Sequence, residues 1–359
     1  MKKEIYSLNF LKGICAILVV LIHTHMVGKI ALVPFYRCAV PVFYMISGYF
    51  LMNENGLWHR EKIRGYIRKM ISIWIIIDII YILFSSILFK EYSPFHETNL
   101  NTCNLLKTIS IEVFFGGQFC LPLWYITAYV WTLVIISFWK KRIPTSIYLS
   151  FIIGLLCLNL ILGAYDFLLP FKPWQPFSNI NVFTTALPFV MLGGFVKLHL
   201  YKLQQLTTKK IYILLVGLSY AEVAILWLLG SKDGDVFMMT PLLSMMIFVG
   251  FIFHPTLGKN TYLTFIGREL SLNIYLLHYL IIWIVGGICY YLQINIRSIE
   301  FLIVFPITFL LCCLINLFKN RKYQIISKMR GGVNDVLFSR FILLLRGYKR
   351  ESYILVSAY

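Results

Sequence analysis

Two ionisable residues bracket the first apolar run of the chain, in "LKGICAILVVLIHTH" at residues 11–25. Lys12 opens the run and His23 closes it, eleven residues later. At about 100° per residue this spacing is three helical turns plus about 20°, so both side chains lie on one face, about 16 Å apart along the axis. That face offers a cation to an anionic group near one end and a titratable base near the other. The simpler alternative is that His23 only hydrogen-bonds a neighbouring helix.

The histidines and cysteines do not indicate a metal site. His25 lies about 200° around a regular helix from His23, so the two imidazoles cannot readily bind one ion. The eight cysteines show no CxxC pair and no zinc-ligand spacing. Cys103 and Cys120 fall near an expected external loop, where they either pair in an oxidising space or stay reduced. We therefore expect no metal cofactor.

Further ionisable residues lie within apolar segments, where each costs about 2.5–3.5 kcal/mol on insertion scales. Such residues tend to face a cavity and to mark function. Asp78 and Glu222 are each expected to pair with a buried cation such as Lys12 or Arg37, or to hold an imidazole in one tautomer. His278, in "SLNIYLLHYLIIW", is either a substrate contact or a structural hydrogen-bonding group.

A basic segment, "WHREKIRGYIRKMISIW", leads into the third apolar run. Arg64 and Arg68 are four residues apart, so they share one helix face, which is directed at the cytoplasmic membrane surface. Their partner is either lipid phosphate or the phosphates of a soluble nucleotide cofactor. The sequence contains no Walker A or GxGxxG motif, so a P-loop or dinucleotide-binding fold is unsupported.

The composition is that of a membrane protein. Of 359 residues, 59% are hydrophobic and 17% aromatic, and only 13% are charged. A soluble domain is about half apolar and about a quarter charged. The net charge of +18 comes from short basic clusters between apolar runs. Anionic lipid and membrane orientation explain such clusters better than nucleic acid does.

Ten apolar runs are long enough to cross about 30 Å of hydrocarbon. They cover residues 11–31, 35–53, 69–89, 122–139, 145–164, 182–198, 211–229, 236–254, 270–292 and 299–318. If the N-terminus is cytoplasmic, 25 of the 33 Lys and Arg residues border cytoplasmic segments and seven border external ones. This positive-inside asymmetry agrees with an even span count. We expect an all-α polytopic protein with about ten transmembrane helices and both termini cytoplasmic.

The two ends of the chain are expected to differ. The basic "MKKEIYSLNF" resembles the start of a signal peptide, but no A-x-A-like cleavage site follows, so we expect an uncleaved first helix. We divide the chain into a transmembrane domain, residues 1–318, and a basic tail, residues 319–359. The tail alternates basic residues with Leu, Ile and Phe. It is either an amphipathic helix on the cytoplasmic leaflet or only a positively charged segment that ends the last membrane span.

The order of these motifs resembles the acyltransferase-3 family of bacterial integral membrane proteins. Lys12, ten residues and His23 are similar to the family's opening basic residue, usually arginine, and its histidine. "VPVFYMISGYFL" at 40–51 and the basic "KIRGYIRKMISIW" resemble the segments that follow. "LPLWYITAYV" at 121–130, "ALPFVMLGGFV" at 186–196 and "LSLNIYLLH" at 270–278 resemble later family segments. The resemblance extends over nearly the whole chain to about residue 318.

The resemblance implies a multi-pass protein of the inner (cytoplasmic) membrane. It implies transfer of an acyl group, commonly acetyl, from cytoplasmic acyl-CoA to a hydroxyl of an envelope glycan or lipid-linked sugar. It also implies that His23 is catalytic and that Lys12 takes part in binding the donor. We take His23 as the general base on the acceptor hydroxyl. The nucleotide of acetyl-CoA, or of another acyl-CoA, is expected to anchor on Arg64 and Arg68.

Five residues are expected to contact substrate. Arg37 stands at the external end of the second span, where it faces either substrate or lipid headgroups. Ser47 belongs to a small-residue notch in the same span. Trp124 and Tyr125 either line the substrate cavity or only pack against other helices. His278 completes this group.

The sequence departs from the family pattern in three places. Lys12 replaces the usual arginine, which keeps the charge but loses the bidentate fork. Asn9 stands where an aspartate is frequent, and Pro122 where a histidine is frequent. These departures concern the donor site and leave His23 in place.

A second resemblance leads to a different function. "IHTH" and the "RCAVPVFYMISGYF" span are similar to the membrane half of vancomycin-resistance-type serine racemases. That half is associated with amino acids and not with acyl transfer. It predicts, as the alternative, an amino-acid (serine-like) binding or transport domain. A structural partner in an envelope-polymer assembly complex is a third possibility.

Overall fold

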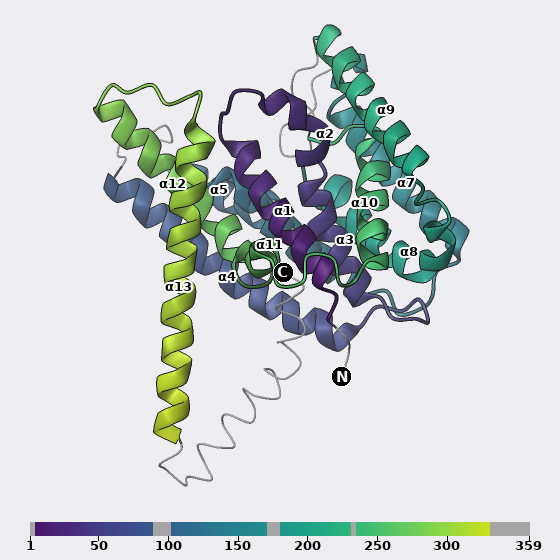
Figure 1. Ribbon diagram of the computed structural model, residues 1–359, viewed down its shortest axis with the longest axis horizontal. Coiled ribbons are helices and arrows are strands. Elements are labelled where there is room, and N and C mark those ends of the chain that lie inside the picture. The colour runs from purple at the N-terminus through teal and green to yellow at the C-terminus, as the bar shows by residue number, and fades with distance from the viewer. Residues whose placement is uncertain (1–3, 89–101, 171–179, 231–234, 331–359) are drawn as a thin grey trace. The chain divides into compact units, whose positions relative to one another are not determined.

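The computed structural model describes residues 4–88, 102–170, 180–230 and 235–330. Within these ranges the regular structure is helical, and the one extended pairing is an isolated bridge between Met52 and Trp58. The chain forms two compact units, residues 1–30 with 251–359 and residues 31–250. Figure 1 labels their helices.

The first unit contains α1 and the C-terminal helices. They are α1 (Tyr6–His23), α11 (Tyr262–Phe265), the π-helical turn η6 (Ile266–Leu270), α12 (Ser271–Tyr291) and α13 (Glu300–Arg330). α11, η6 and α12 follow one another without a break, so the chain is helical from Tyr262 to Tyr291. π-turns of this kind within a helix are frequent near functional sites.

Two glycines let α1 pack directly on this interrupted helix. A Cβ added to Gly267 would overlap the carbonyl oxygen of Asn9, and a Cβ added to Gly13 would overlap the carbonyl oxygen of Leu263. Only glycine permits two helix backbones to approach this closely. The contact therefore fixes the position of α1, and with it the position of His23, against η6 and α12.

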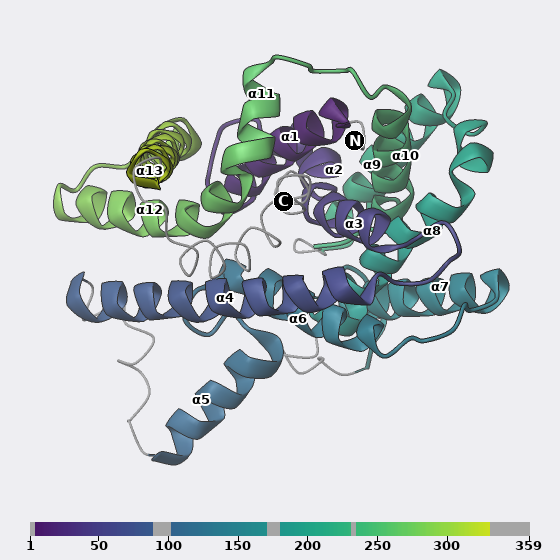
Figure 2. The ribbon, with the colours of Figure 1, turned by 90° about the horizontal axis from the view of Figure 1, so that it is seen from below.

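α12 and α13 lie side by side in both ribbon views (Figures 1 and 2). α13 contains Pro306 and continues past residue 318 to Arg330. The predicted tail thus begins within a continuous helix, and its residues 331–359 lie outside the described part of the chain.

The second unit contains the remaining helices. They are α2 (Val33–Tyr36), α3 (Ala39–Leu51), α4 (Arg60–Leu88), α5 (Thr102–Phe115), α6 (Trp124–Ser137), α7 (Thr145–Leu162), the π-helical turn η5 (Val182–Ala186), α8 (Leu187–Gln204), α9 (Lys209–Leu228) and α10 (Thr240–Phe253). Figure 2 shows α4 and α6 running next to each other, and these two helices are in contact. α3 and α8 approach most closely at Gly48 and Gly193, where added Cβ atoms would overlap the carbonyl oxygens of Val190 and Met45.

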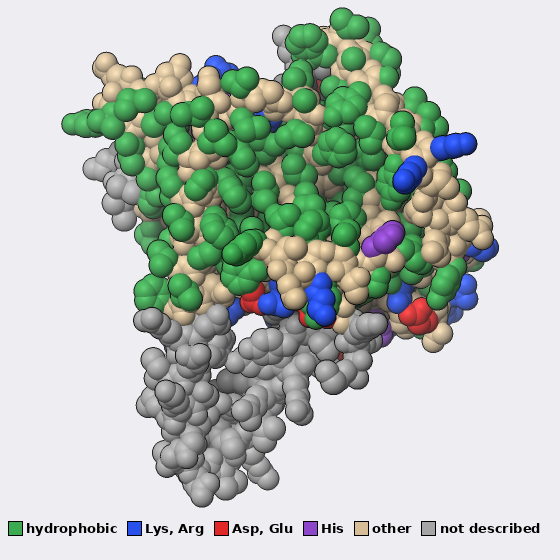
Figure 3. All heavy atoms as spheres, viewed as in Figure 1, with side chains coloured by type: hydrophobic (Ala, Val, Ile, Leu, Met, Phe, Trp, Pro, Cys, Tyr) green, Lys and Arg blue, Asp and Glu red, His purple; other side chains and the backbone are tan. Residues whose placement is uncertain are grey.

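The protein is polytopic, and each of the ten predicted spans falls on a helix. Among the described residues, seven helical segments are long and apolar enough to cross a membrane, and α6 and α10 are shorter apolar helices. Hydrophobic side chains gather on the outside of α13 and α9 (Figure 3). Leu310 on α13 exposes 60% of its surface and Ile213 on α9 exposes 73%, as expected for side chains that face lipid. The count of ten spans and the orientation remain predictions.

The structure bears on two pairings that the sequence left open. Among the described residues Glu222 on α9 forms no ion pair and accepts three hydrogen bonds instead. The donors are the Tyr165 hydroxyl at 2.6 Å and the backbone N–H groups of Met238 and Met239 at 2.5 and 2.9 Å. The carboxylate therefore caps the segment that leads into α10, whose backbone donors would otherwise lack partners. Cys120 is a buried free thiol, which agrees with the alternative that it stays reduced, and the Cys103 side chain lies outside the described part of the structure.

Glu222→Gln is expected to lower the free energy of unfolding by about 1–3 kcal/mol, because an amide places its NH2 group against at least one backbone donor. The measurement is the thermal unfolding of the purified protein in detergent. Glu61→Gln is the matched control, since Glu61 is exposed in the first turn of α4. If both variants unfold at the same temperature as the wild type, Glu222 does not stabilise the α9–α10 connection.

Candidate functional site

His23 and His278 come together within the first unit. His23 is the last residue of α1 and is half-buried, whereas His278 on α12 is fully buried. Their ring centroids are 5.3 Å apart, with the rings tilted by 39°. Tyr279 also lies on α12 and meets the His23 ring edge-on, with the centroids 5.7 Å apart. The sequence predicted both histidines but not this aromatic neighbour, whose only signal was its place beside His278.

The backbone sets the tautomer of His278. Its Nδ1 lies 2.8 Å from the carbonyl oxygen of Tyr275 and 3.1 Å from that of Ile274. A carbonyl oxygen only accepts, so Nδ1 must donate and Nε2 of the neutral ring must carry the lone pair. Nε2 is buried without a hydrogen-bond partner. A proton-accepting nitrogen is thus held in position in the ring that neighbours the His23 ring.

Lys12 is fully buried on α1, so the protein encloses a cation three turns before His23. Asn9 lies one turn earlier and donates from Nδ2 to Glu4 Oε1 at 3.0 Å, while its own Oδ1 is buried without a partner. Glu4 also lies 3.7 Å from Arg268. This end of α1 therefore holds polar and charged groups.

Ser47 and Tyr125 belong to a buried cluster of the second unit that also contains Tyr44 and Tyr129. The Tyr44 ring stacks on Tyr125 with centroids 4.5 Å apart, and its hydroxyl donates to the Tyr125 carbonyl oxygen at 3.1 Å. The hydroxyls of Ser47 and Tyr129 hydrogen-bond to each other. Trp124 is half-buried and meets Tyr125 edge-on. These contacts join α3 to α6, so Ser47 and Tyr125 are packing residues in this structure, and a substrate contact by them remains a proposal.

Arg37 has different surroundings from Arg64 and Arg68. Arg37, one of the cations considered as a partner for Asp78 and Glu222, forms its ion pair with Asp235, with Nη1 and Oδ1 2.7 Å apart. Its Nε is buried without a partner and remains able to donate. Arg64 and Arg68 lie one turn apart on α4, and both are exposed. Neither forms an ion pair with any residue that the structure describes.

Asp78 on α4 is buried with its Oδ1 unpartnered, and its charged neighbour is a second acid, Glu112. Glu112 accepts hydrogen bonds from Trp74 Nε1 at 3.4 Å and from the Gln118 backbone N–H at 2.6 Å. Asp78 forms no ion pair with any residue that the structure describes, so the alternative of a cation partner finds no support there. Among the described residues, no three His, Cys, Asp or Glu side chains gather as a metal site would require.

The chain matches the family described as "Acyltransferase domain" over residues 5–317. It is 26% identical over 353 residues to an amino-acid racemase of Enterococcus faecalis. That alignment covers 88% of this chain but only 46% of the racemase, so the chain spans less than half of that relative's length. No solved structure matches the chain.

Proposed function

Because the chain belongs to the acyltransferase-3 family, we propose that it transfers an acyl group, most simply acetyl, from cytoplasmic acyl-CoA to a hydroxyl of an envelope glycan or lipid-linked sugar. The observation that carries this proposal is the approach of His23 to His278 at 5.3 Å between ring centroids, at the end of a helix face that begins with Lys12. We place the enzyme in the cytoplasmic membrane with ten spans and both termini inside. Residues 1–318 form the transferase domain, and residues 319–359 form a basic tail on the inner leaflet.

In the proposed reaction His23 accepts the proton of the acceptor hydroxyl. The hydroxyl oxygen attacks the thioester carbonyl carbon, a C–O bond forms and the C–S bond breaks. The proton on His23 then passes to the departing thiolate, so the products are an O-acyl ester and free CoA. A positioned general base contributes typically about 10²–10⁴-fold to the rate. The fixed lone pair on His278 Nε2 provides a second acceptor, which receives a hydrogen bond from a different, non-reacting hydroxyl of the sugar.

The donor is proposed to bind through cations. The exposed Arg64 and Arg68 present two guanidinium forks on one face of α4, a geometry suited to the phosphates of the CoA nucleotide. Lys12 supplies a buried positive charge on the helix that carries His23. We assign Arg37, Ser47, Trp124 and Tyr125 to the acceptor side, and the free Nε–H of Arg37 supports its place there.

The racemase relative favours one alternative, in which the chain binds or transports a serine-like amino acid without acyl transfer. In that function the buried lysine would hold a carboxylate. His23 would hydrogen-bond a hydroxyl without removing its proton. The two functions share their residues and differ in whether a thioester is consumed.

A transfer assay separates these functions. Purified protein is incubated with acetyl-labelled acetyl-CoA and an envelope-glycan extract, and in parallel with labelled serine alone. Acyl transfer predicts label on the glycan as an alkali-sensitive ester, and a matching release of free thiol. Saturable serine binding without labelled glycan in any extract would replace the proposed function by the alternative.

A further inference from the structure

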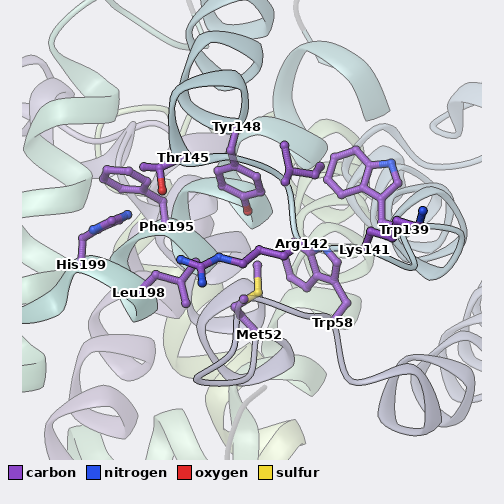
Figure 4. A pocket seen from close by; sticks show the side chains of 12 residues that line it. Met52, Trp58, Trp139, Lys141, Arg142, Thr145, Tyr148, Phe195, Leu198 and His199 are labelled. Carbon is purple, nitrogen blue, oxygen red and sulfur yellow. The ribbon is translucent and has the colours of Figure 1, made fainter.

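A cavity in the second unit lies outside the residues assigned to acyl transfer. It comprises about 390 Å³ of unfilled space, its open mouth included. Its walls come from three separate segments: the connection after α3, the α6–α7 connection with the start of α7, and the end of α8. In Figure 4, Arg142 reaches across the cavity between Tyr148 on one side and Met52 with Trp58 on the other.

The cavity is positively charged. The guanidinium of Arg142 extends toward the end of the cavity where His199 and Phe195 lie (Figure 4). The residues that line the cavity include two cations, Lys141 and Arg142, and one imidazole, His199. No acidic side chain lines the cavity, and Arg142 forms no ion pair with any described residue. Because the lining cations Lys141 and Arg142 have no acidic side chain beside them in the cavity wall, the site favours an anion.

The backbone adds to this preference. α7 starts at Thr145, which lines the cavity, and Pro144 at its N-cap provides no side-chain acceptor. The first N–H groups of the helix are consequently available to an anion, and the helix dipole has the same sign as the side chains. A guanidinium fork beside an imidazole and free N–H groups suits the tetrahedral oxygens of a phosphate ester.

Apolar side chains continue from the cavity along the adjoining helices. Trp139 and Tyr148 belong to its wall, and the Trp139 ring meets Phe151 of α7 with centroids 6.2 Å apart. Phe138 and Ile147 beside them are 70% and 60% exposed. A soluble phosphate ester would leave this apolar surface uncovered, whereas the acyl chains of a lipid would lie along it.

We propose that this cavity binds the phosphate ester of an anionic glycerophospholipid, with the phosphate held by Arg142 and His199 and the acyl chains along the exposed face of α7. The site goes beyond the proposed acyl transfer, because it contains none of the residues assigned to donor, acceptor or proton transfer. It would tie the α6–α7 connection to the inner leaflet and make the protein depend on lipid charge.

The test titrates the purified full-length protein in detergent with dioctanoyl-phosphatidylglycerol and, separately, with dioctanoyl-phosphatidylcholine. Binding is followed by tryptophan fluorescence, since Trp58 and Trp139 line the site. We expect saturable binding of the anionic lipid, and an apparent Kd raised about tenfold or more by Arg142→Gln and by His199→Gln, because each removes a charge-assisted or polar contact to phosphate. Arg142→Lys, which keeps the charge, is expected to retain part of the affinity.

Lys209→Gln is the matched control, because Lys209 is an exposed cation at the start of α9 outside the cavity. It is expected to leave the Kd unchanged. Lipid-free thermal unfolding of each variant shows whether it is folded. Equal lipid affinity in wild type and the Arg142→Gln/His199→Gln double variant would overturn the proposal. If the protein binds inorganic phosphate or adenosine 3′,5′-bisphosphate but not phosphatidylglycerol, the phosphate that the cavity binds does not come from a lipid, and the proposed lipid ligand is overturned.

Discussion

His23→Gln is expected to lower kcat for acyl transfer by about 10²–10⁴-fold, since an amide occupies similar space but cannot accept a proton at neutral pH. KM for the acyl-CoA donor should change little, because donor binding is assigned to Lys12, Arg64 and Arg68. The measurement is the initial rate of acceptor-dependent thiol release by purified protein. Water attack on the thioester is subtracted using reactions that lack the acceptor.

His25→Gln is the matched control for this prediction. His25 follows His23 by two residues, and its side chain is exposed beyond the end of α1. The kcat of the His25→Gln protein should stay close to that of the wild type. Equal losses in the two variants would mean that the effect comes from disturbing the end of α1 and not from loss of a base.

Gly267→Leu is expected to be the most damaging change to the fold. A Cβ at this position already overlaps the Asn9 carbonyl oxygen, and the conflict is with backbone that cannot rotate away. Overpacking typically costs about 1–3 kcal/mol, and a clash between two helix backbones should reach or exceed the upper end of that range. The separation of α1 from η6 would also displace His23 from His278, so activity should fall together with stability.

Gly286→Leu tests whether this effect belongs to the helix contact. Gly286 lies on α12 with no atom near the position of an added Cβ. It should express and unfold like the wild type when followed by fluorescence-detected size exclusion and thermal unfolding. A Gly267→Leu protein as stable as Gly286→Leu would show that the α1–η6 contact can relax.

The length of the apolar runs was sufficient to locate ten helical segments. An apolar run of span length must satisfy its backbone internally in lipid, so each of the ten runs falls on a helix. The ends were less predictable. The second span was predicted at 35–53, whereas α3 covers Ala39–Leu51 after a separate short helix that ends at Tyr36. The third span was predicted at 69–89, whereas α4 already begins at Arg60.

Long-range contacts could not be predicted in the same way. The spacing of Lys12 and His23 defined a face, but the approach of His278 depends on backbone contact at Gly13 and Gly267, which no local pattern encodes. The partners of Arg37 and Glu222 could not be predicted for the same reason. Their true partners are Asp235 and a set of backbone donors, and the tertiary packing of α9 and α10 determines these contacts. The cavity around Arg142 was missed because three distant segments form it.

The central claim is tested most directly by following the labelled acetyl group through a single turnover. Enzyme in excess over acetyl-labelled acetyl-CoA is mixed with saturating acceptor, quenched at intervals and separated into protein, thioester and glycan. The account predicts that label leaves the thioester and reaches the glycan in the wild type, while in folded His23→Gln protein it stays on CoA over the same interval. Label arriving on the glycan at the wild-type rate in His23→Gln would contradict the assignment of this imidazole as the base.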